Sequence, residues 1–210
     1  MYSPINIKRS SKFGNNYWEA YSPKLKRNVR LFSDLEYDFW VLVETDPKIF
    51  TFCERPFEVK YFNKNNKVLK TFFNMWVKWR NGHEEFIVVK YSTNVTSTNI
   101  KILEQWCQEH KKNFAIRSEI NIRGNTVLLE NMKLLLPYLS NRSHPIDTDL
   151  YVIKQEIQRN KHSVGYLEDR LSIGSSRIKE AIFHLYSKGI IDANLHCIPF
   201  GRNLEVWINE

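Results

Sequence analysis

Cysteine and histidine are scarce in this 210-residue chain, and their spacing suits neither a metal site nor a disulfide framework. The three cysteines, Cys53, Cys107 and Cys197, are odd in number, far apart and outside any Cys-x-x-Cys pair. The six histidines form no His-x-x-x-His pair and lie beside no nucleophile motif. This pattern argues against a zinc site and a disulfide scaffold, and it is typical of a reducing compartment.

Long apolar runs are absent as well. No stretch approaches the roughly 18 residues that a membrane helix needs, and the N-terminus shows no apolar signal region. A phosphate-binding loop and a dinucleotide-binding glycine motif are also missing. We therefore expect a cytoplasmic protein with no membrane partner, whose chemistry does not depend on a bound nucleotide cofactor.

Acidic residues are outnumbered. The chain has 31 Lys and Arg against 23 Asp and Glu, a formal net charge of +8 with a pI near 9.3. Such an excess attracts polyanions through counterion release and speeds encounter with them. Binding to nucleic acid is the simplest explanation of this charge, and the alternative is a soluble basic protein with no such partner.

Two apolar runs joined by Arg80-Asn-Gly-His83 predict a β-hairpin. The runs, 70–79 and 86–91, are rich in β-branched and aromatic residues. Asn-Gly supplies two residues that tolerate positive φ in a tight primed turn. Lys90 falls in the middle of the second run, where a lone ammonium should not be buried without a partner. Its position marks the hairpin as a candidate site.

An amphipathic helix is predicted over 33–44. Ser33 is the expected N-cap, and Glu36 follows three residues later as in a capping box. The apolar spacing leaves Glu36 free to face the hairpin. Taken alone, Glu36 is explained as a helix acid that completes the cap, and Lys90 as a strand lysine whose stem packs while its head reaches water.

A set of motifs, taken in order, resembles the N-terminal catalytic domain of the TnsA-type transposon-end endonucleases. The resemblance covers roughly residues 25 to 140, and several motifs in order are more specific than any one of them. The motifs are Val29-Arg-Leu-Phe-Ser-Asp-Leu-Glu36-Tyr-Asp-Phe, Asp46-Pro47, Glu54-Arg-Pro-Phe57, the hairpin, Glu104-Gln-Trp-Cys107, Phe114-Ala-Ile-Arg-Ser-Glu119-Ile-Asn-Ile-Arg123 and Asn131-Met-Lys-Leu-Leu135.

The resemblance implies a restriction-endonuclease-like α/β fold, a mixed sheet with flanking helices, and Mg²⁺-dependent cleavage of DNA. In such nucleases carboxylates hold the metal beside the phosphate, and a lysine orients water or stabilises negative charge. The catalytic positions carried over are Glu36, Asn74 and Lys90. The metal ligands carried over are Glu36, Asn74 and Val89, the last by its main-chain carbonyl.

Two ligand positions depart from the family pattern. Asn74 stands where the family has Asp, so a carbonyl ligand remains but its charge is lost. Val88 stands where the family has Glu or Gln two residues before the lysine, and its side chain has no ligand atom. We expect Mg²⁺ to bind weakly or not at all unless DNA phosphate supplies ligands.

The first domain is predicted to span 1–142, beginning with a basic arm over 1–30. Basic and aromatic residues alternate along this arm, which suits a surface that contacts phosphates, with Arg27 and Arg30 as candidate DNA-binding residues. The alternative is a partly ordered arm solvated by its charges. Helices are expected over 97–110 and 125–138, and an extended segment over 114–117.

The second domain, 143–210, is predicted to be a winged helix, with three helices and a two-stranded wing. The turn Ser172-Ile-Gly174 separates the last two helices as in a helix-turn-helix. The third helix would face DNA with its first residues, and the wing tip would reach a phosphate or the minor groove. The candidate DNA-binding residues are Ser175, Ser176, Arg177, Lys179 and Arg202. A protein-contact role is the open alternative, because acidic residues dilute this face.

The resemblance, the charge and the winged helix together predict a TnsA-like subunit of a heteromeric transposase. It would bind double-stranded DNA at transposon ends beside a TnsB-like transposase and a TnsC-like ATPase, and would cleave the non-transferred strand if active. The changes at Asn74 and Val88 leave a catalytically weakened or inactive DNA-binding and scaffolding subunit as the second hypothesis. A winged-helix DNA-binding regulator is the third.

Overall fold

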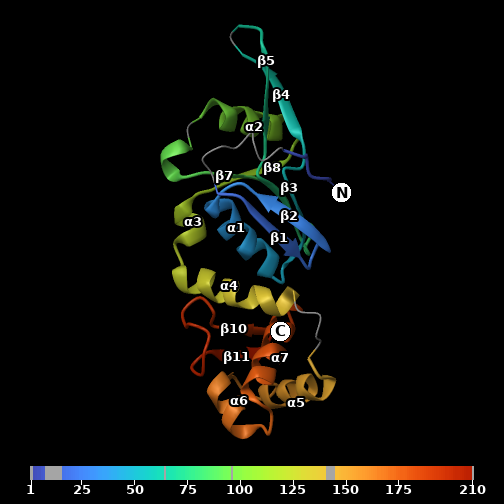
Figure 1. Ribbon diagram of the computed structural model, residues 1–210, viewed down its shortest axis with the longest axis vertical. Coiled ribbons are helices and arrows are strands. Elements are labelled where there is room, and N and C mark those ends of the chain that lie inside the picture. Colours follow the sequence, from blue (N-terminus) through green and yellow to red (C-terminus); the bar gives the residue numbers. More distant parts are fainter. Residues whose placement is uncertain (1, 8–15, 64, 96, 141–144, 210) are drawn as a thin grey trace. The chain divides into compact units, whose positions relative to one another are not determined.

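The computed structural model of the chain describes residues 2–7, 16–63, 65–95, 97–140 and 145–209 (Figure 1). The chain divides into two compact units, 1–44 with 48–124, and 45–47 with 125–210. The predicted boundary at 142/143 therefore differs from the observed one, which lies at 124/125. Both units combine helices and strands, so the expected mixed α/β class is confirmed.

The first unit holds most of the strands. Its elements are β1 (Trp18–Ser22), β2 (Arg27–Leu31), α1 (Asp34–Thr45), β3 (Ile49–Glu54), β4 (Glu58–Phe62), β5 (Val68–Phe72), β6 (Met75–Trp79), β7 (Glu84–Val89), the 3₁₀ turn η2 (Ser92–Asn94), α2 (Thr98–Glu109), β8 (Asn113–Arg117) and α3 (Glu119–Arg123). The helix predicted over 33–44, the helix predicted over 97–110 and the extended segment predicted over 114–117 are all present.

A four-stranded mixed sheet in the order β3-β6-β7-β8 forms the centre of the first unit. The pairs β3/β6 and β6/β7 are antiparallel, whereas β7 and β8 are parallel. The parallel pair requires a crossover, and α2 supplies it. The expected strand, helix, strand crossover and mixed sheet are thus confirmed.

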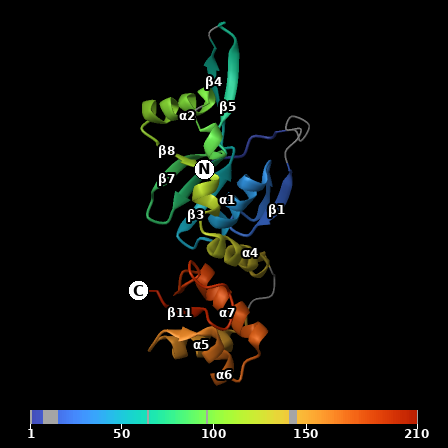
Figure 2. The same cartoon turned by 90° about the vertical axis from the view of Figure 1, so that its left-hand side faces the viewer.

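Two helices cover opposite sides of this sheet (Figures 1 and 2). On one side Ile100, Leu103 and Cys107 of α2 pack with Phe86 and Val88 of β7 in a buried apolar cluster. Because side chains alternate along a strand, neighbouring residues such as Val89 face the other side, where α1 lies. The two sides of β7 therefore belong to different parts of the core.

The β6–β7 hairpin is present, but its turn is not the predicted primed type. Gly82 has φ +88°, whereas Asn81 is not among the described residues with positive φ. The Gly82 N–H donates to Trp79 O at 3.1 Å, and the Trp79 N–H donates to His83 O at 2.8 Å. This is a three-residue loop in which an ordinary turn is followed by a left-handed glycine.

The run 70–79 does not form one strand. Its first part belongs to β5, which pairs with β4 in a separate two-stranded ribbon, and its second part forms β6. Phe73 and Asn74 lie between the two strands. The sequence could not show this division, because β5 takes its partner from outside the hairpin.

The predicted basic arm is largely a folded hairpin in its described part. β1 and β2 pair antiparallel from Trp18↔Leu31 to Ser22↔Arg27. Near the N-terminus, Tyr2 packs edge-on against Trp76, with ring centroids 5.0 Å apart. The arm's basic residues Lys8, Arg9 and Lys12 lie outside the described residues.

The second unit consists of helices around a small sheet. Its elements are α4 (Thr126–Ser140), α5 (Asp147–Ile157), β9 (His162–Ser163), α6 (Val164–Arg170), α7 (Ser175–Ser187), β10 (Ile191–Ala193) and β11 (Glu205–Ile208), with the sheet order β10-β11-β9. The three helices and two later strands expected after residue 143 are present, and β9 adds a third, unpredicted strand.

Asn131 explains why α4 belongs to the second unit. Its buried side chain donates to Leu195 O and Ile198 O, both at 2.8 Å, and accepts the Phe200 N–H at 2.8 Å. All of these partners lie more than 60 residues later in the sequence. The chain has no helix, among the residues described, that is long and apolar enough to cross a membrane.

Candidate nucleic-acid interface

Glu36 is held by the first turn of α1. Its N–H donates to Ser33 Oγ at 3.1 Å, and its Oε2 accepts the Phe32 N–H at 3.0 Å. The first bond satisfies a backbone donor of the first helical turn, and the second ties the carboxylate to the residue before the N-cap. The cap predicted from the sequence is present, and it engages one carboxylate oxygen.

Asn74 connects Glu36 to the end of β7. Its Nδ2 donates to Glu36 Oε1 at 2.7 Å, and its Oδ1 accepts the Val89 N–H at 2.9 Å. The backbone donor fixes which end of the amide faces which partner, since Val89 N–H requires an acceptor. Glu36, Asn74 and Val89 are therefore joined by hydrogen bonds, with Val89 taking part through its N–H and not through the carbonyl that was expected to hold a metal.

Arg55 is a member of this site that sequence reasoning missed. It is 4% exposed, its Nη1 lies 3.9 Å from Glu36 Oε2, and its guanidinium lies 4.8 Å from the Phe32 ring centroid. Burial lowers the pKa of Arg55, while the charge of Glu36 opposes that shift. The only signal for it was its place in Glu54-Arg-Pro-Phe57, a motif given no chemical role.

The backbone at Arg55 is also unusual. Its φ is +45°, a left-handed conformation that is uncommon for a residue other than glycine. The Arg55 N–H donates to Asn74 O at 3.0 Å, and Nη2 donates to Arg30 O at 2.7 Å. These contacts hold the strained residue in place and set its cation beside Glu36.

The donor set around Glu36 does not fit Mg²⁺. Hard divalent cations take several oxygen ligands with carboxylate charge, whereas this site offers one carboxylate and one amide oxygen. Both Glu36 oxygens already accept hydrogen bonds, and a guanidinium lies within 4 Å. In the described part of the chain, no group of three His, Cys, Asp or Glu could hold a metal ion.

Lys90 is placed differently from the prediction. β7 ends at Val89, and Lys90 follows it as an exposed residue whose N–H donates to Arg117 O at 3.2 Å. It is therefore neither in the middle of the strand nor buried. Its ammonium makes no ion pair or hydrogen bond with any other described residue.

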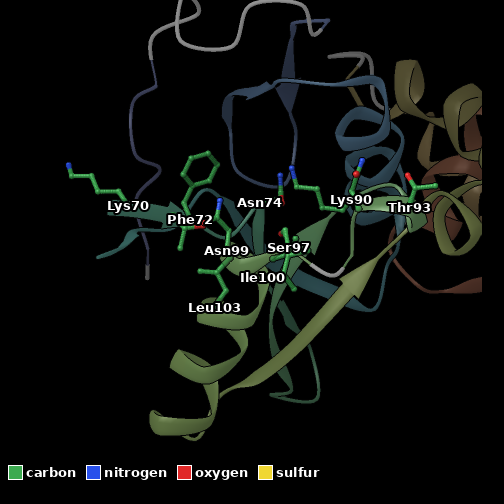
Figure 3. A pocket seen from close by; sticks show the side chains of 12 residues that line it. Lys70, Phe72, Asn74, Lys90, Thr93, Ser97, Asn99, Ile100 and Leu103 are labelled. Atoms are coloured by element: carbon green, nitrogen blue, oxygen red, sulfur yellow. The ribbon is translucent and has the colours of Figure 1, made fainter. Parts of the chain in front are cut away.

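A groove with a volume of about 500 Å³ lies beside Asn74 and Lys90 (Figure 3). Two lysines and six amide or hydroxyl side chains line it together with four apolar side chains, and none of the described residues that line it carries a carboxylate. The lining residues are Lys70, Thr71, Phe72, Asn74, Val88, Lys90, Thr93, Asn94, Ser97, Asn99, Ile100 and Leu103.

Four separate segments build this groove. β5 supplies Lys70, the link before β6 supplies Asn74, Lys90 follows β7, and the start of α2 supplies Asn99. Val88 also lines it, although its side chain belongs to the apolar cluster under α2. Glu36 is not among the residues that line the groove, and its link to the groove is the hydrogen bond that it accepts from Asn74.

The charge of the groove is positive. Lys70 Nζ lies 2.7 Å from Glu58 Oε2, so its charge is partly balanced, whereas Lys90 has no acidic partner among the described residues. Lysines together with hydroxyl and amide donors are the groups that contact phosphate oxygens in complexes with nucleic acids. The groove can accept an anionic backbone without a metal.

The two arginines predicted in the N-terminal arm are placed differently from each other. Arg27 makes two 2.6 Å hydrogen bonds to the buried carboxylate of Glu54, which raise the pKa of Arg27. The charge of Arg27 therefore balances a buried carboxylate within the first unit. Arg30 is exposed, with its Nη1 3.4 Å from Asn6 Oδ1 and its Nε 3.9 Å from Glu19.

Three of the residues predicted to read DNA at the start of α7 and in the wing are bonded to acids instead. Arg177 donates to both oxygens of Asp149 at 2.8 and 2.7 Å. Arg202 donates to Glu168 at 2.9 Å and to Asp169 at 2.6 Å, and Ser175 Oγ donates to Glu168.

The acids near Arg202 raise its pKa, Asp169 most of all. Ser176 is exposed on α7 and Lys179 is half-buried there. This face therefore keeps one lysine without an acidic partner among the described residues.

A comparison with models of protein families and a search of curated proteins each find no match for this chain.

Proposed function

We propose that this chain is a DNA-binding subunit that holds DNA through its first unit without cleaving it. The observation that carries the proposal is the groove beside Asn74, which presents Lys70 and Lys90 among amide and hydroxyl groups. A phosphate backbone complements such a surface, and the net charge of +8 favours the encounter.

The contacts of the Glu36 carboxylate do not suit the metal binding that DNA cleavage requires. The Asn74 amide donates to Glu36 where the resembling nucleases have a second carboxylate, and Arg55 supplies the compensating positive charge. One carboxylate with both oxygens engaged is a poor metal ligand. The site is better suited to holding α1 against the sheet than to activating water.

The resemblance to the TnsA-type endonucleases gives this binding role a context. The proposal is a scaffolding subunit on a restriction-endonuclease-like fold, bound to transposon-end DNA beside a TnsB-like transposase and a TnsC-like ATPase. The second unit would be a winged helix that contacts protein rather than DNA, because Arg177 and Arg202 are paired with acids of their own unit.

Binding of the full chain to a labelled 30-base-pair duplex tests the proposal. If about six phosphates are neutralised, the logarithm of affinity should fall against log salt with a slope near −5, and EDTA should leave it unchanged. Lys90→Gln should weaken binding several-fold, whereas Lys101→Gln, at an exposed lysine of α2 outside the groove, should not.

A plasmid nicking assay with Mg²⁺ or Mn²⁺ completes the test. We expect no nicking by the natural chain. Binding that is independent of salt would overturn the DNA-binding role, and metal-dependent nicking abolished by Glu36→Gln would restore the nuclease hypothesis.

A further inference from the structure

The β4–β5 ribbon presents an exposed face whose residues are matched across its two strands. In its register Lys60 lies opposite Lys70, and Phe62 lies opposite Val68. Residues directly opposite each other in an antiparallel pair project from the same face. One face of the ribbon therefore carries a lysine pair and, farther toward the turn, an apolar pair.

The lysine pair is unfavourable for the ribbon alone. Like charges directly opposite each other in a sheet repel. Glu58 offsets the charge of Lys70 at 2.7 Å, but Lys60 is exposed and makes no ion pair with the described residues. An anion bound across this face would remove the repulsion.

The apolar pair is unusually open to solvent. Phe62 is 71% exposed and Val68 is 49% exposed. Their cross-strand pairing leaves most of Phe62 and about half of Val68 open to solvent, although the opposite face of the ribbon is anchored. Apolar side chains at the end of a basic ribbon are suited to contact with base edges or thymine methyl groups.

The ribbon is held at its base and closed at its turn, so little ordering is needed before it binds. Val59 is buried in the cluster under α2, and the Tyr61 hydroxyl donates to Asn99 Oδ1 at 2.8 Å. At the turn, Asn63 Oδ1 accepts the N–H groups of Asn65 and Lys67 at 3.0 and 2.9 Å. Figure 1 shows the ribbon extending away from the central sheet.

The exposed face continues into the groove. Lys70 and Phe72 belong to the same face as Lys60 and Phe62, and both also line the groove that contains Lys90 (Figure 3). A nucleic acid held in the groove would therefore meet the ribbon along one continuous surface.

We infer that the β4–β5 ribbon enters the major groove of double-stranded DNA held at the Lys70 and Lys90 groove. This inference rests on the proposed function and adds the form of the DNA and the element that reads it. The major groove, about 12 Å wide, admits a two-stranded ribbon. Lys60 and Lys70 contact phosphates, and Phe62 and Val68 contact base edges.

The test measures binding of the full chain and three variants to matched duplexes. One duplex is unmodified, and the other carries glucosylated hydroxymethylcytosines, whose sugars fill the major groove. The ribbon variant is Phe62→Ser with Val68→Ser. The matched control is Phe50→Ser, which changes another exposed aromatic residue, on β3. The groove variant is Lys90→Gln. Circular dichroism and melting temperature confirm that each variant is folded.

The expected pattern separates the ribbon from the groove. The natural chain should lose about tenfold in affinity on the glucosylated duplex, the size of a lost base-edge contact. The ribbon variant should lose about tenfold on the unmodified duplex and nothing further on the glucosylated one. Phe50→Ser should behave like the natural chain, and netropsin, which fills the minor groove, should compete weakly.

Several outcomes would overturn the inference. If the ribbon variant binds as the natural chain does while Lys90→Gln weakens binding, the ribbon role fails and the proposed function stands. If glucosylation has no effect, or a single strand binds as tightly as the duplex, the major-groove placement fails. If the natural chain binds no DNA, the proposed function fails and the inference with it.

Discussion

The two units of this chain differ sharply in charge. The sequence of the first unit contains 21 Lys and Arg and 12 Asp and Glu, a difference of +9, whereas the second contains 10 and 11, a difference of −1. Together these give the +8 of the whole chain. The positive charge is therefore not a property of the protein as a whole but of one unit.

The cations at the two candidate DNA-binding surfaces differ as well. In the first unit Lys60 and Lys90 have no ion-pair partner among the described residues, while in the second unit Arg177 and Arg202 are bonded to Asp149, Glu168 and Asp169. A cation that already has a carboxylate partner gains less from a phosphate, because it must first lose that partner. The helix-turn-helix pattern alone could not show that these two arginines are paired within their own unit.

We expect the largest loss of DNA affinity when lysines of the first unit are removed, and the same change in the second unit serves as the comparison. Lys70→Gln with Lys90→Gln should weaken duplex binding by tenfold or more and make the salt slope shallower by about 2, since two phosphate contacts are lost. Lys179→Gln with Lys188→Gln removes the same charge from the second unit and should change affinity by less than about twofold. Equal losses from both pairs would mean that charge alone, and not the groove, drives binding.

The ion pairs of the second unit should affect stability rather than binding. Asp149 is 4% exposed, so Arg177→Ala leaves a buried carboxylate without its two hydrogen bonds. We expect a loss of about 1 to 3 kcal/mol in the free energy of unfolding, measured by urea titration, with DNA affinity unchanged. Asp149→Asn combined with Arg177→Gln should recover part of the loss. A drop in DNA affinity without a loss of stability would show that Arg177 contacts DNA.

The Glu36 site of the first unit is expected to respond to metal only after mutation. Asn74→Asp replaces the donated hydrogen bond with a second carboxylate and should lower the unfolding free energy by about 1 to 3 kcal/mol in EDTA. Millimolar Mg²⁺ or Mn²⁺ should restore part of that stability, because a ligand that binds only the folded state stabilises it. Asn74→Ala is the control, with a similar loss and no metal effect. Stabilisation of the natural chain by Mg²⁺ would contradict our interpretation of the site.

Thiol reactivity offers a smaller contrast between the units. Burial raises the pKa of Cys53 to about 12 and that of Cys107 to about 11, both from 9.0, whereas Cys197 of the second unit is exposed. At pH 8 Cys197 should react quickly with a disulfide reagent, and Cys53 and Cys107 only on unfolding. Rapid reaction of two or more thiols would contradict this.

The same two buried thiols should make stability depend on pH. Because Cys53 and Cys107 keep protons in the folded state that the unfolded chain loses above pH 9, the free energy of unfolding should fall from pH 9 to 11.

Prediction from the sequence succeeded where the contacts are local. The β6–β7 hairpin and the Ser33 cap of α1 depend on residues within a few positions of each other, so propensity and spacing carry enough information. The turn type was wrong because Asn81 does not take positive φ, and Lys90 was wrongly placed because the run 86–91 is longer than β7.

Longer-range contacts account for what the sequence did not show. β5 leaves the expected hairpin strand because it pairs with β4, and α4 joins the second unit because Asn131 bonds backbone groups 64 to 69 residues away. Arg27 and Glu54 are 27 residues apart, and Arg202 and Glu168 are 34 apart. No local pattern distinguishes these paired cations from free ones.

The sequence by itself determined the Ser33 cap of α1, the β6–β7 hairpin and the total charge of this protein, because these follow from residue type and near neighbours. Tertiary structure alone decided which charges remain available. It brought Arg55 and Asn74 to Glu36, where they complete a hydrogen-bonded site, and left Lys90 exposed in a groove without carboxylates. The physical reason is that the interaction of a charged group depends on its distance to partners in space, which chain position does not determine.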